Sequence, residues 1–141
     1  MAYNIRMDKD NPALQICLHP IGFVRNAMKE RTDKRLKLTE LFSEIEVDEK
    51  LAEALDGLKD FSHIIVLYWM HQARRDLVLQ TPFQKETTGT FALRSPVRPN
   101  PIASSVVELT GVDGNVLQVR GLDCLDGTPL IDLKPKHGAH D

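Results

Sequence analysis

Long apolar runs and cysteines are scarce in this 141-residue sequence, which contains only two cysteines and one tryptophan. The longest uninterrupted apolar segment runs from Ile64 to Met70, far short of the ~20 residues that a membrane-spanning helix needs. The opening residues, MAYNIRMDKD, contain no apolar stretch of the kind found in secretory signals. We therefore expect a cytoplasmic protein without a membrane partner.

Several common site motifs are also missing. Cys17 and Cys124 lie far apart and form no CxxC motif, so neither a disulfide framework nor a zinc site is supported, and we expect two buried thiols. The five histidines lack the spacing of metal ligands, so we expect no bound metal. Because no GxGxxG, GxxxxGK[ST] or GxSxG motif occurs, a Rossmann sheet, a P-loop and a nucleophile elbow are all disfavoured.

What is present is an ordinary globular composition, with 42% hydrophobic and 27% charged residues. We expect a single domain over residues 1–141, with a polar leader at 1–13 and a short tail at 136–141. The net charge of -2 hides a local asymmetry. Residues 25–37 contain six basic and two acidic side chains, whereas residues 40–60 contain eight acidic and two basic ones. The basic segment is either a phosphate-binding loop or a solvated one.

Alternating and apolar runs predict a mostly antiparallel sheet or barrel. We expect strands in residues 14–26 (with a bend), 42–47, 61–70, from 89 onward, on both sides of Asp113–Asn115 as a hairpin, and 130–135. The apolar run 61–70 should be the central strand, buried on both faces. One prominent α-helix is predicted after Asp48, which can cap it, because Leu51, Leu55 and Leu58 follow at helical spacing.

The segment RSPVRPNPIASS, Arg94 to Ser105, is stiff and basic, with three prolines and no acidic residue. Prolines exclude a helix interior or a central strand and favour a rigid extended loop. Arg94 and Arg98 offer planar forks for a carboxylate or phosphate, and Asn100 offers both a donor and an acceptor. A stiff surface connection with solvated arginines is the alternative.

Two further segments have the same double interpretation. His71 and Gln72 directly follow the apolar strand, where loops often carry function, although a lone histidine there is commonly structural. The turn residues Asp126–Pro129 precede Asp132 and Lys134, which share one face of a short strand. Those two side chains would suit a ribose and a phosphate or acid, but equally an exposed salt bridge.

Taken together, three segments resemble the TsaA-like family, which includes tRNA methyltransferases of the TrmO type. They are GLKDFSHIIVLYWMHQ, GTFALRSPVRPNPIASSVVEL and GLDCLDGTPLIDLKP, with HPIGFVRN as a weaker fourth. The resemblance runs from about His19 to Pro135, and the pairing of RSPxRPNPI with DGTPxxDxKP is highly specific.

This resemblance implies a small antiparallel β-barrel that binds S-adenosylmethionine without a Rossmann fold, as a homodimer with cofactor sites near the interface. It implies N6-methylation of threonylcarbamoyladenosine beside the anticodon of a tRNA. The family's cofactor contacts match His71, Gln72, Arg94, Ser104, Asp126, Gly127, Thr128 and Pro129.

From this resemblance we assign further roles as hypotheses. Arg94 would bind the cofactor carboxylate, and Arg98 a substrate phosphate or acid. Asp132 would be the base and Asn100 would orient the acceptor. Lys134, Arg25 and Lys29 would contact the substrate, the last two through tRNA phosphates. The alternatives are a methyltransferase of a small molecule that uses the same cofactor, and a non-enzymatic module that binds it.

Overall fold

The computed structural model describes residues 16–30 and 37–138. The polar leader predicted at 1–13 lies outside these residues, as do Arg31, Lys34 and Arg35 of the basic segment and the end of the predicted tail. No helix in the described part of the chain is long and apolar enough to cross a membrane.

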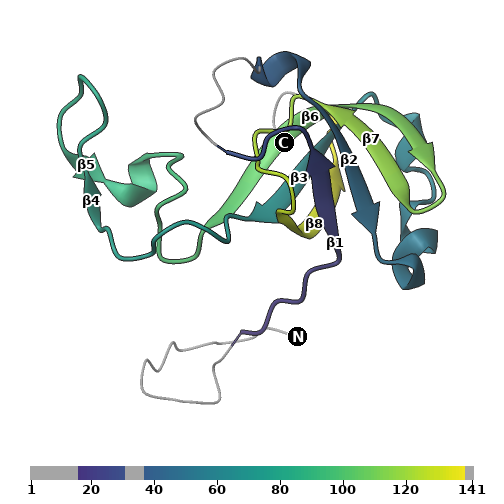
Figure 1. The fold of residues 1–141 in the computed structure, drawn as a ribbon, viewed down its shortest axis with the longest axis horizontal. Coiled ribbons are helices and arrows are strands. Elements are labelled where there is room, and N and C mark those ends of the chain that lie inside the picture. The colour runs from purple at the N-terminus through teal and green to yellow at the C-terminus, as the bar shows by residue number, and fades with distance from the viewer. Residues whose placement is uncertain (1–15, 31–36, 139–141) are drawn as a thin grey trace.

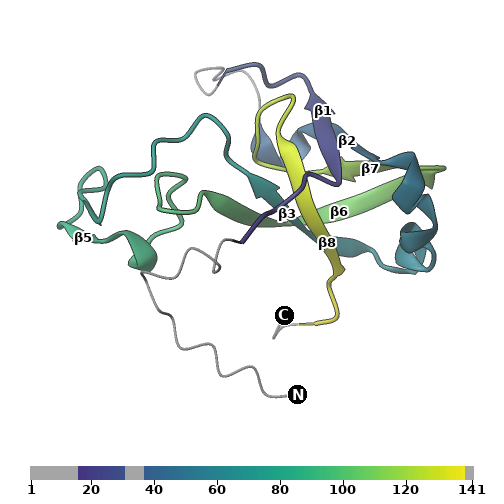
Figure 2. The same cartoon turned by 90° about the horizontal axis from the view of Figure 1, so that it is seen from below.

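Six antiparallel strands close into a barrel in the order β1-β2-β7-β6-β3-β8 (Figures 1 and 2). They are β1 (Gly22–Asn26), β2 (Phe42–Val47), β3 (His63–Trp69), β6 (Ile102–Asp113), β7 (Val116–Arg120) and β8 (Pro129–Pro135). The predicted fold class, a mostly β barrel with one helix, is confirmed. The hairpin is confirmed as well, because Asp113 pairs with Val116 across a two-residue turn.

The barrel closes between the first and last strands. Gly22 pairs with Val47 of β2 and also with Leu130 of β8. A Cβ atom built on Gly22 would lie 2.1 Å from the carbonyl oxygen of Glu46. Only glycine therefore lets the three strands approach this closely.

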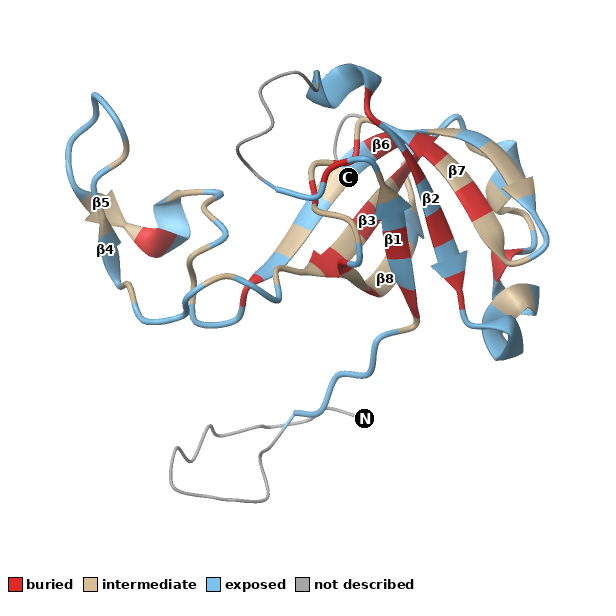
Figure 3. Ribbon diagram, in the orientation of Figure 1, coloured by how far each residue is buried: buried red, intermediate tan, exposed pale blue. Residues whose placement is uncertain are grey.

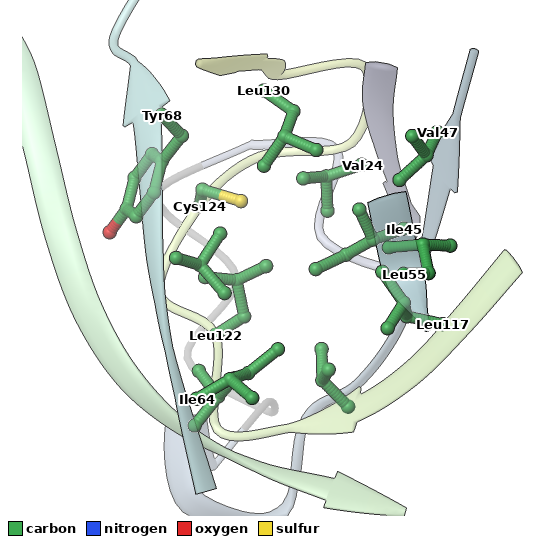
Figure 4. Close-up of a cluster of buried hydrophobic side chains, with 13 residues drawn as sticks. Val24, Ile45, Val47, Leu55, Ile64, Tyr68, Leu117, Leu122, Cys124 and Leu130 are labelled. Atoms are coloured by element: carbon green, nitrogen blue, oxygen red, sulfur yellow. The ribbon is translucent and has the colours of Figure 1, made fainter. Parts of the chain in front are cut away.

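The core fills the barrel interior, and buried residues concentrate on the barrel strands (Figure 3). The strands β1, β2, β3 and β7 alternate buried inward positions with more exposed outward ones, as half-buried strands do. Figure 4 shows the inward side chains meeting, with Ile45 and Leu117 among those that are fully buried. The prediction that β3 is buried on both faces is wrong, because its odd-numbered residues face outward and only its even-numbered ones are buried.

The predicted helix is present, but as 3-10 helix. It comprises η2 (Glu49–Leu55), and the shorter η3 (Leu58–Asp60) follows. Asp48 caps η2 as expected, since its carboxylate accepts a hydrogen bond from Lys50 N at 3.0 Å. Gly57 has a φ of +83° between the two, a conformation that ends a helix. Another 3-10 turn, η1 (Leu38–Glu40), precedes β2.

An arm formed by residues 71–101 projects from the barrel beside β3 and β6 (Figures 1 and 2). It contains the short strands β4 (Leu79–Gln80) and β5 (Thr88–Gly89) and the turn η4 (Thr90–Ala92). The strand expected from residue 89 onward is therefore wrong beyond Gly89. The chain turns there because buried Thr90 donates to Leu77 O at 2.8 Å and accepts from Gln80 at 3.0 Å.

Two smaller expectations also need correction. The proline-rich segment is a loop only as far as Pro101, because Ile102–Ser105 already form the start of β6. Cys124 is a buried thiol as expected, whereas Cys17 is exposed. Cys17 precedes the barrel, so the chain around it has no core against which to pack.

Candidate functional site

Two adjoining clefts lie where the arm leaves the barrel. The arginine cleft, of about 680 Å³, is lined by residues that include Tyr68, Met70, Arg94, Pro96, Arg98, Ser104, Ser105 and Asp123. The histidine cleft, of about 380 Å³, is lined by residues that include Met70, His71, Gln72, Pro96, Val97, Leu125 and Thr128. Met70 and Pro96 line both clefts, so the two clefts lie side by side and share part of their walls.

The histidine cleft is built where β3 ends. Met70 N donates to Pro101 O at 2.8 Å, which ties the end of the strand to the proline-rich loop. His71 N then donates to Trp69 O at 2.9 Å, and the chain turns outward. Across the cleft, Thr128 is buried, and its hydroxyl donates to Leu125 O at 2.7 Å. His71 and Gln72 are exposed side chains at the rim of this cleft.

Arg94 lies in the arginine cleft and its guanidinium donates to the backbone carbonyl of Ser104. The same nitrogen is 3.5 Å from the hydroxyl of Ser104. The structure thus brings these two predicted cofactor residues together. An arginine held at one nitrogen keeps other N–H donors for a carboxylate.

Arg98 has a different position. Its guanidinium donates to the carbonyl oxygens of Leu93 at 3.0 Å and Ser95 at 2.9 Å. These bonds close the proline-rich loop onto itself, so in this chain Arg98 stiffens the loop. The role of Arg98 in substrate binding stays a prediction. To bind a substrate, Arg98 would have to use the guanidinium N–H groups that these two bonds leave over.

Asp126 and Gly127 line a third, shallow hollow together with Arg25 and Lys29. Lys29 forms an ion pair with the Asp126 carboxylate, which also accepts from Asn26 N at 3.0 Å. The bond from Lys29, followed by that from Asn26, lowers the pKa of Asp126 below its ordinary value. Arg25 likewise forms an ion pair with Glu46, at 2.8 Å. Both predicted substrate residues at this hollow, Lys29 and Arg25, thus already have acidic partners.

The predicted catalytic pair is not assembled within one chain. Asp132 lies in a separate cleft of about 350 Å³ between β8 and the 3-10 helices. Its carboxylate is 3.1 Å from Lys134 Nζ, which is the salt bridge left open as an alternative. Asn100 accepts from Arg75 at 3.1 Å, at the base of the arm. Pro129 begins β8 and pairs with Phe23.

Sequence reasoning missed Ser105 and Asp123 as parts of the cleft. Both lie in segments that carry the family resemblance, but neither had an assigned role, and Tyr68 stands in an apolar run, where a side chain can face the core or a ligand. Only the pairing of β3 with β6 places Tyr68 near Ser105. In the described ranges, no group of three or more His, Cys, Asp or Glu side chains could hold a metal ion.

A family model described as the tRNA-methyltransferase O N-terminal domain matches residues 26–141. The chain belongs to this family. The resemblance identified from the motifs is therefore confirmed, and it covers the barrel from the end of β1 together with the arm and both clefts.

Curated relatives agree with this assignment. A probable S-adenosyl-L-methionine-binding protein VirR from Rhizobium radiobacter is 47% identical over 118 residues, covering 82% of this chain and 67% of the relative. An S-adenosyl-L-methionine-binding protein from Archaeoglobus fulgidus is 44% identical over 120 residues, covering 83% of this chain and 86% of the relative. These names describe the relatives' ligand.

A solved structure of TrmO from Pseudomonas aeruginosa superposes with a TM-score of 0.71 at 32% identity. The match covers 89% of this chain but only 57% of the TrmO chain. A further TrmO crystal structure gives a TM-score of 0.73 at 34% identity and is covered over 58% of its length. This chain therefore spans little more than half of the TrmO structures that it matches.

Proposed function

We propose that this chain binds S-adenosylmethionine in the two adjoining clefts and transfers its methyl group to N6 of threonylcarbamoyladenosine beside the anticodon of a tRNA. The observation that carries the proposal is the meeting, around Met70 and Pro96, of five residues that the motifs had already marked. These residues are His71, Gln72, Arg94, Ser104 and Thr128. Family membership and the relatives' names support the same ligand.

The clefts suit a nucleoside joined to an amino acid. Their volumes, about 680 and 380 Å³, lie in the range of small-molecule sites. Met70 and Val97 offer apolar surface to a base, and Arg94 offers a guanidinium to a carboxylate. The cofactor would supply a methyl group activated by a sulfonium centre. The protein's task is then to hold an acceptor nitrogen in line with it at about 3–3.5 Å.

The acceptor nitrogen belongs to a urea-like group and is a weak nucleophile, so a base would have to take its proton. Asp132 remains the predicted base, but within one chain it lies in a different cleft from His71 and Arg94. It would reach the acceptor only in an assembly that brings β8 of another chain to the cleft. Turnover by Asp132→Asn, measured beside cofactor binding, tests this role: lost turnover with intact binding supports it.

Titration calorimetry of the purified protein with S-adenosylmethionine is the decisive binding experiment. We expect about one site per chain, and Arg94→Ala should weaken binding by roughly tenfold or more, as loss of a bond to a charged group does. Arg120→Ala is the matched control, because Arg120 is an exposed arginine on β7 that faces Glu108 at 3.9 Å. Wild-type protein without heat of binding would remove the basis of the proposal.

The tRNA part of the proposal predicts salt-dependent binding through Arg25 and Lys29. Both are exposed and belong to the basic segment, and a phosphate would have to replace Glu46 or Asp126 as their partner. Arg25→Glu with Lys29→Glu should weaken tRNA binding and reduce its salt dependence, because counterion release scales with the number of phosphate contacts. Unchanged tRNA binding, with S-adenosylmethionine binding intact, would favour a small-molecule acceptor.

A second candidate is a module that binds the cofactor without turnover. The names of the bacterial and archaeal relatives, which describe binding alone, favour it. Transfer of a labelled methyl group to tRNA that carries threonylcarbamoyladenosine separates the two candidates. Tight binding without transfer to any tRNA fraction would support the module.

The proposed active form is a homodimer with its clefts near the interface. Large apolar side chains stand exposed on the arm, with Val78 at 77%, Phe83 at 88% and Phe91 at 82% exposure. Phe91 also lines the arginine cleft. A second copy that covered the arm would therefore also border the ligand. The cytoplasmic location expected from the sequence stays a prediction.

A further inference from the structure

A chain of hydroxyl groups runs through the inner wall of the arginine cleft. Tyr68 is only 3% exposed, yet its side chain borders the cleft. Figure 4 shows its hydroxyl pointing away from the apolar cluster around Leu130 and Cys124. The phenol oxygen is 2.8 Å from Ser105 Oγ and 2.9 Å from the carbonyl oxygen of Asp123.

The direction of these hydrogen bonds follows from counting protons. A carbonyl oxygen can only accept, and a phenol has one proton to donate. Tyr68 therefore donates to Asp123 O. Ser105 must then be the donor in the bond between the two hydroxyl groups. With its single proton committed to Tyr68, the Ser105 hydroxyl can act only as an acceptor toward a ligand.

Several polar groups follow one another along the wall of this cleft. Arg94 donates to the backbone carbonyl of Ser104, the residue before Ser105 on β6, and the Ser105 hydroxyl connects through Tyr68 to the backbone carbonyl of Asp123. The Arg94 cation therefore lies beside Ser104 in this cleft, and the backbone carbonyl oxygen of Asp123 lies beside Tyr68. Between them is a hydroxyl that can only accept. A ligand with a carboxylate and an ammonium on the same carbon, as in an α-amino acid, would match this arrangement.

We propose that Tyr68 is a positioning residue that holds the Ser105 hydroxyl as a hydrogen-bond acceptor for the ammonium group of a zwitterionic amino-acid ligand. The carboxylate of the ligand lies at Arg94 and its ammonium lies between Ser105 and Asp123. The inference rests on the proposed function, in which this amino acid is the methionyl end of S-adenosylmethionine. It assigns selectivity for the amino group to two residues that had no role in the sequence-based prediction of the site.

The test compares ligands that differ only in the amino group. S-adenosylhomocysteine and an analogue with hydrogen in place of the α-amino group are titrated into wild type, Ser105→Ala and Tyr68→Phe. Wild type should prefer the amino ligand by roughly tenfold or more, as expected for a hydrogen bond to a charged group. Ser105→Ala should lose most of that preference. Tyr68→Phe should lose part of the preference. Without the phenol, the Ser105 hydroxyl can rotate, and it must give up its other orientations to accept a hydrogen bond from the ligand.

Thr110→Ala is the matched control, because Thr110 lies on the same strand and bonds Gln118 O at 3.1 Å, in the hairpin. It should keep the full preference. Thermal unfolding of each variant shows whether it is folded, and Ser105→Ala carries the test alone if Tyr68→Phe is unstable. An unchanged preference in Ser105→Ala would overturn the inference while leaving cofactor binding standing.

A second pair of probes separates this inference from the function. L-methionine and 4-(methylthio)butanoate, which lacks the amino group, are titrated by NMR. If S-adenosylhomocysteine fails to bind but Ser105→Ala abolishes a preference for L-methionine, the amino-acid site stands and the cofactor assignment falls. If wild type binds neither amino ligand, both are overturned.

Discussion

At the scale of single residues, the structure shows which polar groups are held by the protein itself. Asp126 was marked as a cofactor residue, and its carboxylate connects the DGTP turn to Lys29 and to Asn26 N. The Asn26 side chain extends this connection to Cys124 O at 3.0 Å and Ser43 Oγ at 3.1 Å. Asp126 therefore joins the turn to the end of β1, whatever it contributes to a ligand.

This arrangement predicts a pH effect on stability. Because the folded-state pKa of Asp126 is lowered by its bonds to Lys29 and Asn26 N, its contribution is present above the ordinary carboxyl pKa of about 4 and is lost as pH falls through the lower folded-state value. Asp126→Asn should cost about 1 kcal/mol at pH 7 and less at pH 2. Urea unfolding at both pH values measures this difference.

Asp113→Asn serves as the control, since Asp113 is an exposed residue next to the hairpin turn. The difference in the free energy of unfolding between Asp113→Asn and wild type should be about the same at the two pH values. An equal loss for Asp126→Asn at pH 7 and pH 2 would show that the carboxylate charge has no part in the stabilisation.

At the scale of elements, the barrel depends on close strand approach at Gly22. Gly22→Ala should destabilise the protein by roughly 2–3 kcal/mol or more, because the added Cβ would lie 2.1 Å from a backbone oxygen that cannot move aside cheaply. Gly89→Ala is the matched control: its backbone φ is -67° and no heavy atom lies within 4 Å of an added Cβ. Chemical denaturation measures the stability of both variants. Equal midpoints for Gly22→Ala and Gly89→Ala would contradict the claim that barrel closure requires a glycine at position 22.

The core elements give an independent prediction. Leu117 on β7 is fully buried within the cluster that joins all six barrel strands. Leu117→Ala should cost about 2–5 kcal/mol, the range for removing a buried leucine side chain. Leu79→Ala, at an exposed leucine of β4, should change the free energy of unfolding by less than about 0.5 kcal/mol. Thermal or urea unfolding compares the two, and a small loss for Leu117→Ala would mean that the interior repacks.

At the scale of the whole molecule, the arm is the feature that a single chain leaves incompletely packed. Phe83→Ser should weaken the proposed dimer by roughly tenfold or more, because an apolar side chain that is 88% exposed in one chain would be buried by a second copy. Phe42→Ser, at a barrel phenylalanine that is 47% exposed, should leave the dimer intact. Light scattering coupled to size exclusion measures the mass, and a monomeric wild type would contradict the dimer.

Much of the architecture was predictable because it is local. Alternating side chains identified β2, β6 and β7, an apolar run identified β3, and Asp48 marked the start of the helix. Errors arose where tertiary contacts override local preference. The segment after Gly89 looks like a strand, but Thr90 is held by Leu77 and Gln80 and turns the chain.

The sequence by itself determined the strand pattern, the hairpin turn and the motifs that identify the family, since these depend on neighbours along the chain. The tertiary structure decided which marked residues meet. Arg94 and Ser104 come together, as do His71 and Thr128, while Asp132 lies in another cleft. It also decided that Arg98 binds its own loop and that Ser105 faces Tyr68. Strand pairing in the barrel sets neighbours that are distant in sequence, such as Tyr68 and Ser105, and no spacing along the chain encodes them.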